Sequence, residues 1–334
     1  MALSIAEKTD VTNIGLMLVS AIVAMILPFE VFLFSYAILG PLHYLTEISW
    51  LHEKKYFTRE RYDAVILIIV GLLITLKYYD QYIELDFPDG FDNNLMYIAL
   101  LCSIIFVTVK NKLYRIGGIL LVIFSSMLAK NYNLFFAIFL PTLIHVYVFT
   151  GLFMLYGALK SKSRFGIPAV IALILCPILL MVVFPDRAFY PPTNYSIGAY
   201  SLFKIVNVHW LMNVNGIPAQ SSTKAWDTII FHSKEGILLM RFIAFAYTYH
   251  YLNWFSKTKI IQWHNIPKAR FVAVIIIWLI SIAIYISDYS TGLRWLVFLS
   301  FLHVLLEFPL NVTSVIGIGS YFKEKIFKSS PAKA

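Results

Sequence analysis

Four histidines lie inside apolar stretches of the chain, one histidine to each stretch. They are His43 in GPLHYLTE, His145 in LPTLIHVYVFTG, His250 in FAYTYHYLNWF and His303 in FLHVLLEF. Ionisable side chains are costly within a membrane and usually mark a functional site there. Imidazole is a good ligand for iron, copper, zinc and nickel. One histidine on each of four helices could form a metal site inside a helix bundle.

Two of these histidines are followed, four residues later, by a glutamate. The pairs His43 and Glu47, and His303 and Glu307, therefore lie one turn apart on one face of a helix. A metal-bound imidazole usually donates its second N–H to a carboxylate, a carbonyl or water. We expect Glu47 and Glu307 to be catalytic residues that orient a ligand, bind the metal or relay a proton.

Other polar residues are weaker candidates for the same site. Thr150 follows His145 by five residues, and Asn253 follows His250 by three, so either could orient a ligand. The remaining histidines are predicted at or outside the membrane surface, and they are His52, His209, His232 and His264. The structural alternative is that the intramembrane histidines only form hydrogen bonds between helices.

The elements that must position these residues are transmembrane helices. Hydrophobic residues make up 60% of the chain and charged residues 13%, and the mean hydropathy is +0.76. A helix needs about 20 mostly apolar residues to cross a bilayer. The sequence predicts an all-α, polytopic transmembrane helix bundle of nine or ten spans, in a single integral membrane domain over 1–334. The expected spans are 14–27, 29–51, 62–78, 94–109, 113–129, 133–158, 166–184, 236–256, 271–287 and 293–320.

The distribution of charge predicts the topology. Basic loops alternate with acidic or neutral ones, and the tail near Lys328 is basic, which is typical of cytoplasmic loops and a cytoplasmic C-terminus. The net charge of +9 therefore needs no nucleic acid to explain it. We expect a multi-pass protein of a bacterial cytoplasmic membrane. The long segment 185–235, rich in aromatic residues, is predicted to be an ordered cap on the outer side.

The four histidine segments, in this order, resemble the Brp/Blh-like bacterial β-carotene 15,15'-dioxygenases. GPLHYLTE is similar to the family's Gly-Leu-Pro-His-Gly-x-x-Asp segment, and FLHVLLEF to its Pro-His-x-x-x-x-Asp segment. LIHVYVFT stands where the family has Ile-His-Phe-Gly-x-x-Asp. AYTYHYLNWF stands where the family has a helix with His followed by basic residues and a further His, and this second His is absent here. The sequence departs from the family by Glu47 in place of Asp and by Thr150 near the position of the second acid.

The resemblance implies a non-haem Fe(II) site, dioxygen as co-substrate and oxidative cleavage of a carotenoid. It would assign iron ligation to His43, His145, His250 and His303. From the resemblance and the residues together, we expect a membrane-integral oxygenase acting on a lipophilic small molecule, either a carotenoid or another long-chain lipid from the membrane.

Two other functions remain open on the sequence. The intramembrane histidines and glutamates could form the ion path of a proton- or ion-coupled secondary transporter. A structural or assembly protein, whose outer cap binds a partner, is the third possibility. Metal analysis of the purified protein would separate the oxygenase from the other two.

Overall fold

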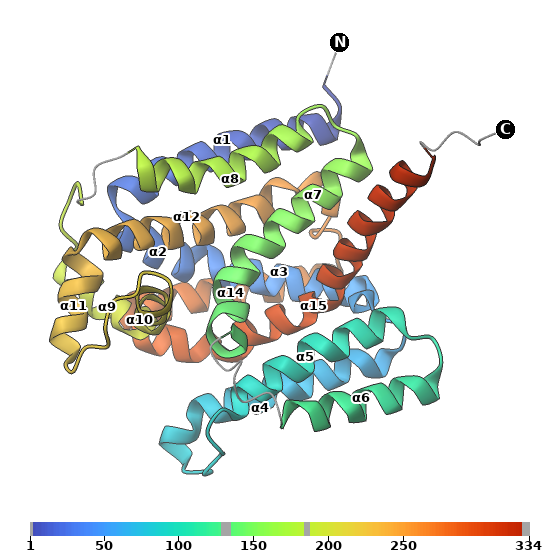
Figure 1. The fold of residues 1–334 in the computed structure, drawn as a ribbon, viewed down its shortest axis with the longest axis horizontal. Coiled ribbons are helices and arrows are strands. Elements are labelled where there is room, and N and C mark those ends of the chain that lie inside the picture. The colour runs from blue at the N-terminus through green and yellow to red at the C-terminus, as the bar shows by residue number, and fades with distance from the viewer. Residues whose placement is uncertain (1–2, 128–134, 184–187, 329–334) are drawn as a thin grey trace.

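Helices are the only regular elements in the part of the chain that the structure describes. The computed structural model describes residues 3–127, 135–183 and 188–328. Figure 1 shows the helices packed into a bundle in which most of the long helices run in one general direction. The all-α prediction is therefore confirmed.

Within the described residues, each of the ten predicted spans falls largely on helical backbone. The bundle helices are α1 (Ile5–Ile26), α2 (Pro28–Phe34), α3 (Gly40–Glu53), α4 (Arg61–Ile83), α5 (Phe91–Thr108), α6 (Lys112–Ser126), α7 (Thr150–Ser161), α8 (Gly166–Val182), α12 (Lys234–Ser256), α14 (Lys268–Ser287) and α15 (Tyr289–Lys328). A π-helical segment, η1 (Ser35–Leu39), joins α2 to α3, and a second one, η4 (Phe135–Phe149), leads into α7. Residues 128–134, where the predicted fifth span ends and the sixth begins, lie outside the described residues.

Seven of the described helices are long and apolar enough to cross a membrane, fewer than the nine or ten expected. The helix α6 has 15 residues and α8 has 17, so both are shorter than the seven candidate spans, each of which has at least 18 residues. The helix α12 has 23 residues but is too polar to meet the same criterion. The polar side chains of α12 are compatible with a membrane protein, because α1, α2, α8 and η4 pack around α12 and shield it from lipid.

The apolar stretch divided by Pro28 forms a tight hairpin rather than one kinked helix. The helix α1 ends at Ile26, and Leu27 leaves the helical region with φ −133° and ψ 62°. Pro28 then occupies the first turn of α2, where its missing N–H is tolerated. In Figure 1 the chain reverses its direction at this point, so α2 and α3 lead back toward the end of the bundle at which α1 begins.

Prolines also shape the two elements that carry His145 and His303. Pro141 lies inside η4, four residues before His145, and interrupts the regular helical hydrogen bonding. Pro309 lies inside α15, which has 40 residues and bends on its way to the C-terminus in Figure 1. Both histidines are therefore placed next to an irregular part of a helix.

The segment predicted to be a cap is ordered in the residues that are described. It contains α9 (Asn194–Tyr200), α10 (Lys204–Asn213) and α11 (Thr223–His232), and residues 184–187 lie outside the description. Tyr200 packs edge-on against Phe29 at 5.2 Å and so fixes the cap to α2. Figure 1 shows these helices at the end of the bundle opposite the C-terminus.

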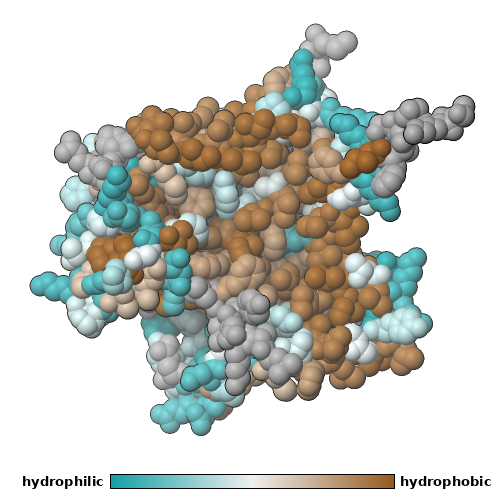
Figure 2. Space-filling model, in the orientation of Figure 1, coloured by the Kyte–Doolittle hydropathy of each residue, from teal (hydrophilic) through white to brown (hydrophobic). Residues whose placement is uncertain are grey.

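The surface supports a multi-pass membrane protein. Figure 2 shows apolar side chains over the middle of the bundle, and hydrophilic ones at the cap and at the opposite end. Large apolar side chains are exposed along this middle zone, for example Ile171 at 49% and Leu279 at 54%. Exposed apolar surface on this scale is unusual in a soluble monomer, and contact with lipid accounts for it.

One buried ion pair ties α4 to α6. Asp63 and Arg115 are 4% and 6% exposed, and their side chains are paired directly. We predict that Arg115→Met lowers the free energy of unfolding by about 3–5 kcal/mol, because it leaves the Asp63 carboxylate buried without its partner. Reversible unfolding in mixed micelles measures this change.

The control is Arg270→Met, which removes an exposed partner of Glu53. Exposed pairs contribute about 1 kcal/mol or less, so this variant should unfold nearly as the unmodified protein does. Equal losses in the two variants would show that the Asp63–Arg115 pair does not hold α4 and α6 together.

Candidate metal centre

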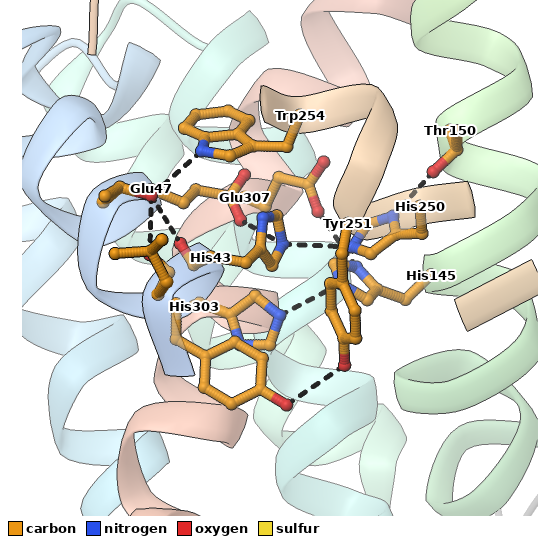
Figure 3. A network of polar contacts seen from close by, with 12 residues as sticks. His43, Glu47, His145, Thr150, His250, Tyr251, Trp254, His303 and Glu307 are labelled. Carbon is orange, nitrogen blue, oxygen red and sulfur yellow. Dashed lines mark hydrogen bonds and ion pairs between the residues drawn. The ribbon is translucent and has the colours of Figure 1, made fainter. Parts of the chain in front are cut away.

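The four intramembrane histidines meet inside the bundle. His43 comes from α3, His145 from η4, His250 from α12 and His303 from α15. All four side chains are between 1% and 6% exposed, so none of them faces lipid or water. Figure 3 shows the four rings directed toward one another from four separate segments. The predicted convergence is therefore found in the structure.

The ring nitrogens are spaced as ligands of one metal ion would be. Nε2 of His43 lies 3.1 Å from Nε2 of His250, and Nε2 of His145 lies 3.2 Å from Nε2 of His303. Ligand atoms of His43, His250 and His303 lie within 4.8 Å of one another. Nitrogens bound at about 2.1 Å to one ion would be about 3.0–3.4 Å from their neighbours.

Hydrogen bonds between neutral imidazoles would explain each of the two short nitrogen–nitrogen distances separately. Such bonds would not explain why three or more imidazoles from separate helices meet at one point. The donor set is all imidazole, which suits a divalent transition metal. The residues present therefore fit a metal ion of this kind.

Each of three histidines has a polar atom close to the ring nitrogen that faces away from the cluster. Thr150 Oγ1 lies 2.7 Å from Nδ1 of His250, and Glu307 Oε2 lies 2.9 Å from Nδ1 of His145. The carbonyl oxygen of Leu299 lies 3.3 Å from Nδ1 of His303. Such partners fix the orientation of a ring and select which nitrogen faces the metal.

The two glutamates occupy different positions. Glu307 contacts the ring of His145, which lies on another helix, and not the ring of His303 on its own helix. Glu47 Oε2 lies 3.1 Å from Nε2 of His43, the nitrogen that faces the cluster. Glu47 is therefore beside the position a metal would occupy, whereas Glu307 lies behind a ligand. Both are buried, at 2% and 8% exposure.

The other sequence candidates are not part of the cluster. His52 is exposed and its Nδ1 lies 3.0 Å from the Tyr56 hydroxyl. In the described residues, no cluster of side chains that could bind a metal ion includes His209, His232 or His264. Asn253 accepts a hydrogen bond from Tyr249 at 3.4 Å, so the structure gives it no contact with His250.

Two tyrosines that the sequence did not single out stand against the cluster. The ring of Tyr44 stacks on His303 with centroids 4.3 Å apart, and Tyr251 lies 5.3 Å from His43. Their hydroxyls lie 3.2 Å apart, as Figure 3 shows. A Cβ atom at Gly40 would lie 2.9 Å from the Tyr44 hydroxyl, so glycine is needed there for close approach.

An apolar cavity of about 260 Å³ opens from the cluster toward the cap. His145, His250 and His303 form one part of its lining, and Tyr200 and Phe203 of the cap form another. Most of the remaining lining is aromatic or aliphatic. Its size is near the lower end of small-molecule sites, which begin at about 300 Å³. The cavity gives a lipophilic molecule a place beside the imidazoles.

We predict that removing the partners of the imidazoles weakens metal binding without unfolding the protein. Thr150→Val and Glu307→Gln should each reduce metal affinity by about 10–100-fold, because the ring they orient becomes free to turn. Thr108→Val and Glu53→Gln are the controls, because both side chains are exposed, and both should leave affinity unchanged. Chelator competition followed by metal analysis measures the affinities. Indistinguishable affinities in all four variants would mean that Thr150 and Glu307 only join helices.

Comparisons with known proteins give no further identification. No family model, no curated protein and no solved structure matches this chain.

Proposed function

We propose that the protein is a membrane-integral, non-haem iron oxygenase that acts on a hydrophobic substrate taken from the bilayer. The observation that carries this proposal is a cluster of four buried imidazoles at one end of an apolar, aromatic-lined cavity. A metal site and a lipophilic binding site would then share the same residues, namely His145, His250 and His303.

The donor set favours a metal that keeps positions free for other ligands. Four neutral imidazoles leave open positions on Fe(II), and iron bound there would supply the activation of dioxygen. Imidazole also binds copper and zinc, so the choice of iron draws on the resemblance of the four histidine segments to the carotenoid dioxygenases. The substrate we propose is a carotenoid or another long-chain lipid.

The chain's own residues would bind and orient the substrate. The largely apolar lining would exclude water, so the reaction would take place in a medium of low dielectric constant. Aromatic side chains of the cap, including Phe203, and of the bundle, including Tyr36 and Tyr247, would hold an extended apolar chain. The paired hydroxyls of Tyr44 and Tyr251 would supply polar groups next to the imidazoles.

A proton- or ion-coupled transporter is the second candidate, and the two buried glutamates favour it. Glu47 and Glu307 each lie within 3.1 Å of a histidine nitrogen, as partners in a proton path would. A transporter does not need four imidazoles at one point, however. Metal content separates the two functions.

We predict that the purified protein holds about one equivalent of transition metal. His43→Ala, His145→Ala, His250→Ala and His303→Ala should each lose most of it, because each removes a proposed ligand. His264→Ala, at an exposed position, is the control and should retain the metal. Elemental analysis after removal of loosely bound metal gives the result.

The opposite result would be a folded protein without transition metal that catalyses proton-coupled uptake in vesicles. That outcome would replace the oxygenase with the transporter. Equal metal content in the four variants and in the control would show that the metal is bound elsewhere.

We also propose that the C-terminus faces the cytoplasm of a bacterial cell and the cap faces the opposite side. The basic loops 54–61, 110–115, 160–164 and 257–270 support this, because Figure 1 shows them at the end of the bundle away from the cap. A phosphatase reporter that is active only outside the cytoplasm should be inactive when fused after Ala334 and active when inserted near Gly216. The reverse pattern would invert the topology.

A further inference from the structure

A second, much smaller cavity lies against the cluster and differs from the apolar one in its lining. Its volume is about 20 Å³. Glu47, Glu307, Asn253 and Lys257 contribute polar groups to its lining, together with the rings of His43 and His250. Because His250 also lines the apolar cavity, the histidine cluster separates a lipophilic compartment from a polar one.

Four residues that line this small cavity each have a buried polar atom without a hydrogen-bond partner. These atoms are His43 Nδ1, Glu47 Oε2, Glu307 Oε2 and Lys257 Nζ, none of which has a hydrogen-bonding partner among the described residues. The two carboxylate oxygens lie at ion-pair distance from imidazoles but without hydrogen-bond geometry. Leaving a buried polar group unsatisfied costs about 1–3 kcal/mol, and more for a charged one. Four such atoms around one space indicate a bound molecule that satisfies them.

The size of the space and its polar lining fit one water molecule. A cavity needs about 10–15 Å³ to hold a water molecule, and the water needs two to four polar partners. At about 20 Å³, the cavity is large enough for one water molecule but too small for a larger ligand. Polar groups that face each other beyond direct hydrogen-bonding distance are commonly bridged by a water.

Lys257 supplies the positive charge on this side of the centre. It is the first residue after α12, and its Nζ lies 4.6 Å from the centre of the Phe153 ring. Burial lowers the pKa of Lys257 to about 8, while the charges of Asp10 and Glu307 oppose that shift. The ammonium form therefore predominates at neutral pH.

We propose that Lys257, through one water bound in this cavity, holds the carboxylate of Glu307 in position beside the imidazole of His145. Lys257 is then a positioning residue, because it touches neither the metal nor the substrate. The metal-dependent part of this inference rests on the proposed function. The coupling between Lys257 and Glu307 does not, because it is a property of the folded protein.

The test is a double-mutant cycle between Lys257 and Glu307. Lys257→Met and Lys257→Gln are made in the unmodified protein and in Glu307→Gln. Lys257→Arg keeps the charge, and Lys259→Met is the matched control, since Lys259 is an exposed lysine two residues further along the chain. Metal affinity is measured by chelator competition, and the unfolding midpoint is measured on metal-free protein.

We expect Lys257→Met and Lys257→Gln to lower metal affinity by about 10-fold, the lower end for outer partners of a metal ligand. Lys257→Arg and Lys259→Met should retain the affinity. In the Glu307→Gln background, neither substitution of Lys257 should cause a further loss, because the carboxylate through which Lys257 acts is already absent. The unfolding midpoints of the metal-free proteins should show the same lack of additivity.

Two results would overturn the inference. One is a loss of the same size in both backgrounds, which would assign Lys257 a role independent of Glu307. The other is an affinity and a midpoint in Lys257→Met that match Lys259→Met. If the unmodified protein binds no transition metal, the proposed function fails by itself. The midpoints of the metal-free proteins then decide whether Lys257 and Glu307 are coupled.

Discussion

The arrangement of the bundle depends on one constraint, which is that polar groups buried between apolar helices must satisfy one another. Four imidazoles and two carboxylates lie in the interior, and an isolated charge in such a place is strongly unfavourable. They avoid this cost only where α3, η4, α12 and α15 meet. The helices must therefore pack so that these side chains reach one another, and a cation among them would complete the balance of charge.

This constraint also explains why the two sides of the cluster differ. Toward the cap, aromatic residues such as Tyr247 and Phe203 line a cavity suited to an apolar molecule. Toward the basic end of the bundle, Lys257 and the carboxylates surround a space of about one water. On the proposed function, substrate would approach the metal from the first side, while the second side would hold the ligands in place.

The sequence alone predicted the helical class, the cap and the four histidines, because each of these leaves a local signal. Apolar runs, loop charges and a histidine within an apolar run can be read from neighbouring residues. The side chains that contact the histidine rings could not be predicted in this way. Glu307 contacts His145, 162 positions away in the chain, although it lies one turn from His303. Thr150 was a weaker candidate, yet it contacts His250, and α12 is shielded by helices that no local pattern identifies.

The proposed function requires that one metal ion be bound by His43, His145, His250 and His303. X-ray absorption spectroscopy at the iron edge, on protein loaded with Fe(II) without oxygen, measures the ligands of that ion. We expect a first shell dominated by nitrogen at about 2.0–2.2 Å, with outer-shell scattering from about four imidazole rings. In a protein with His250→Ala, one imidazole should be lost from that scattering. A first shell of oxygen without imidazole scattering would contradict this set of ligands.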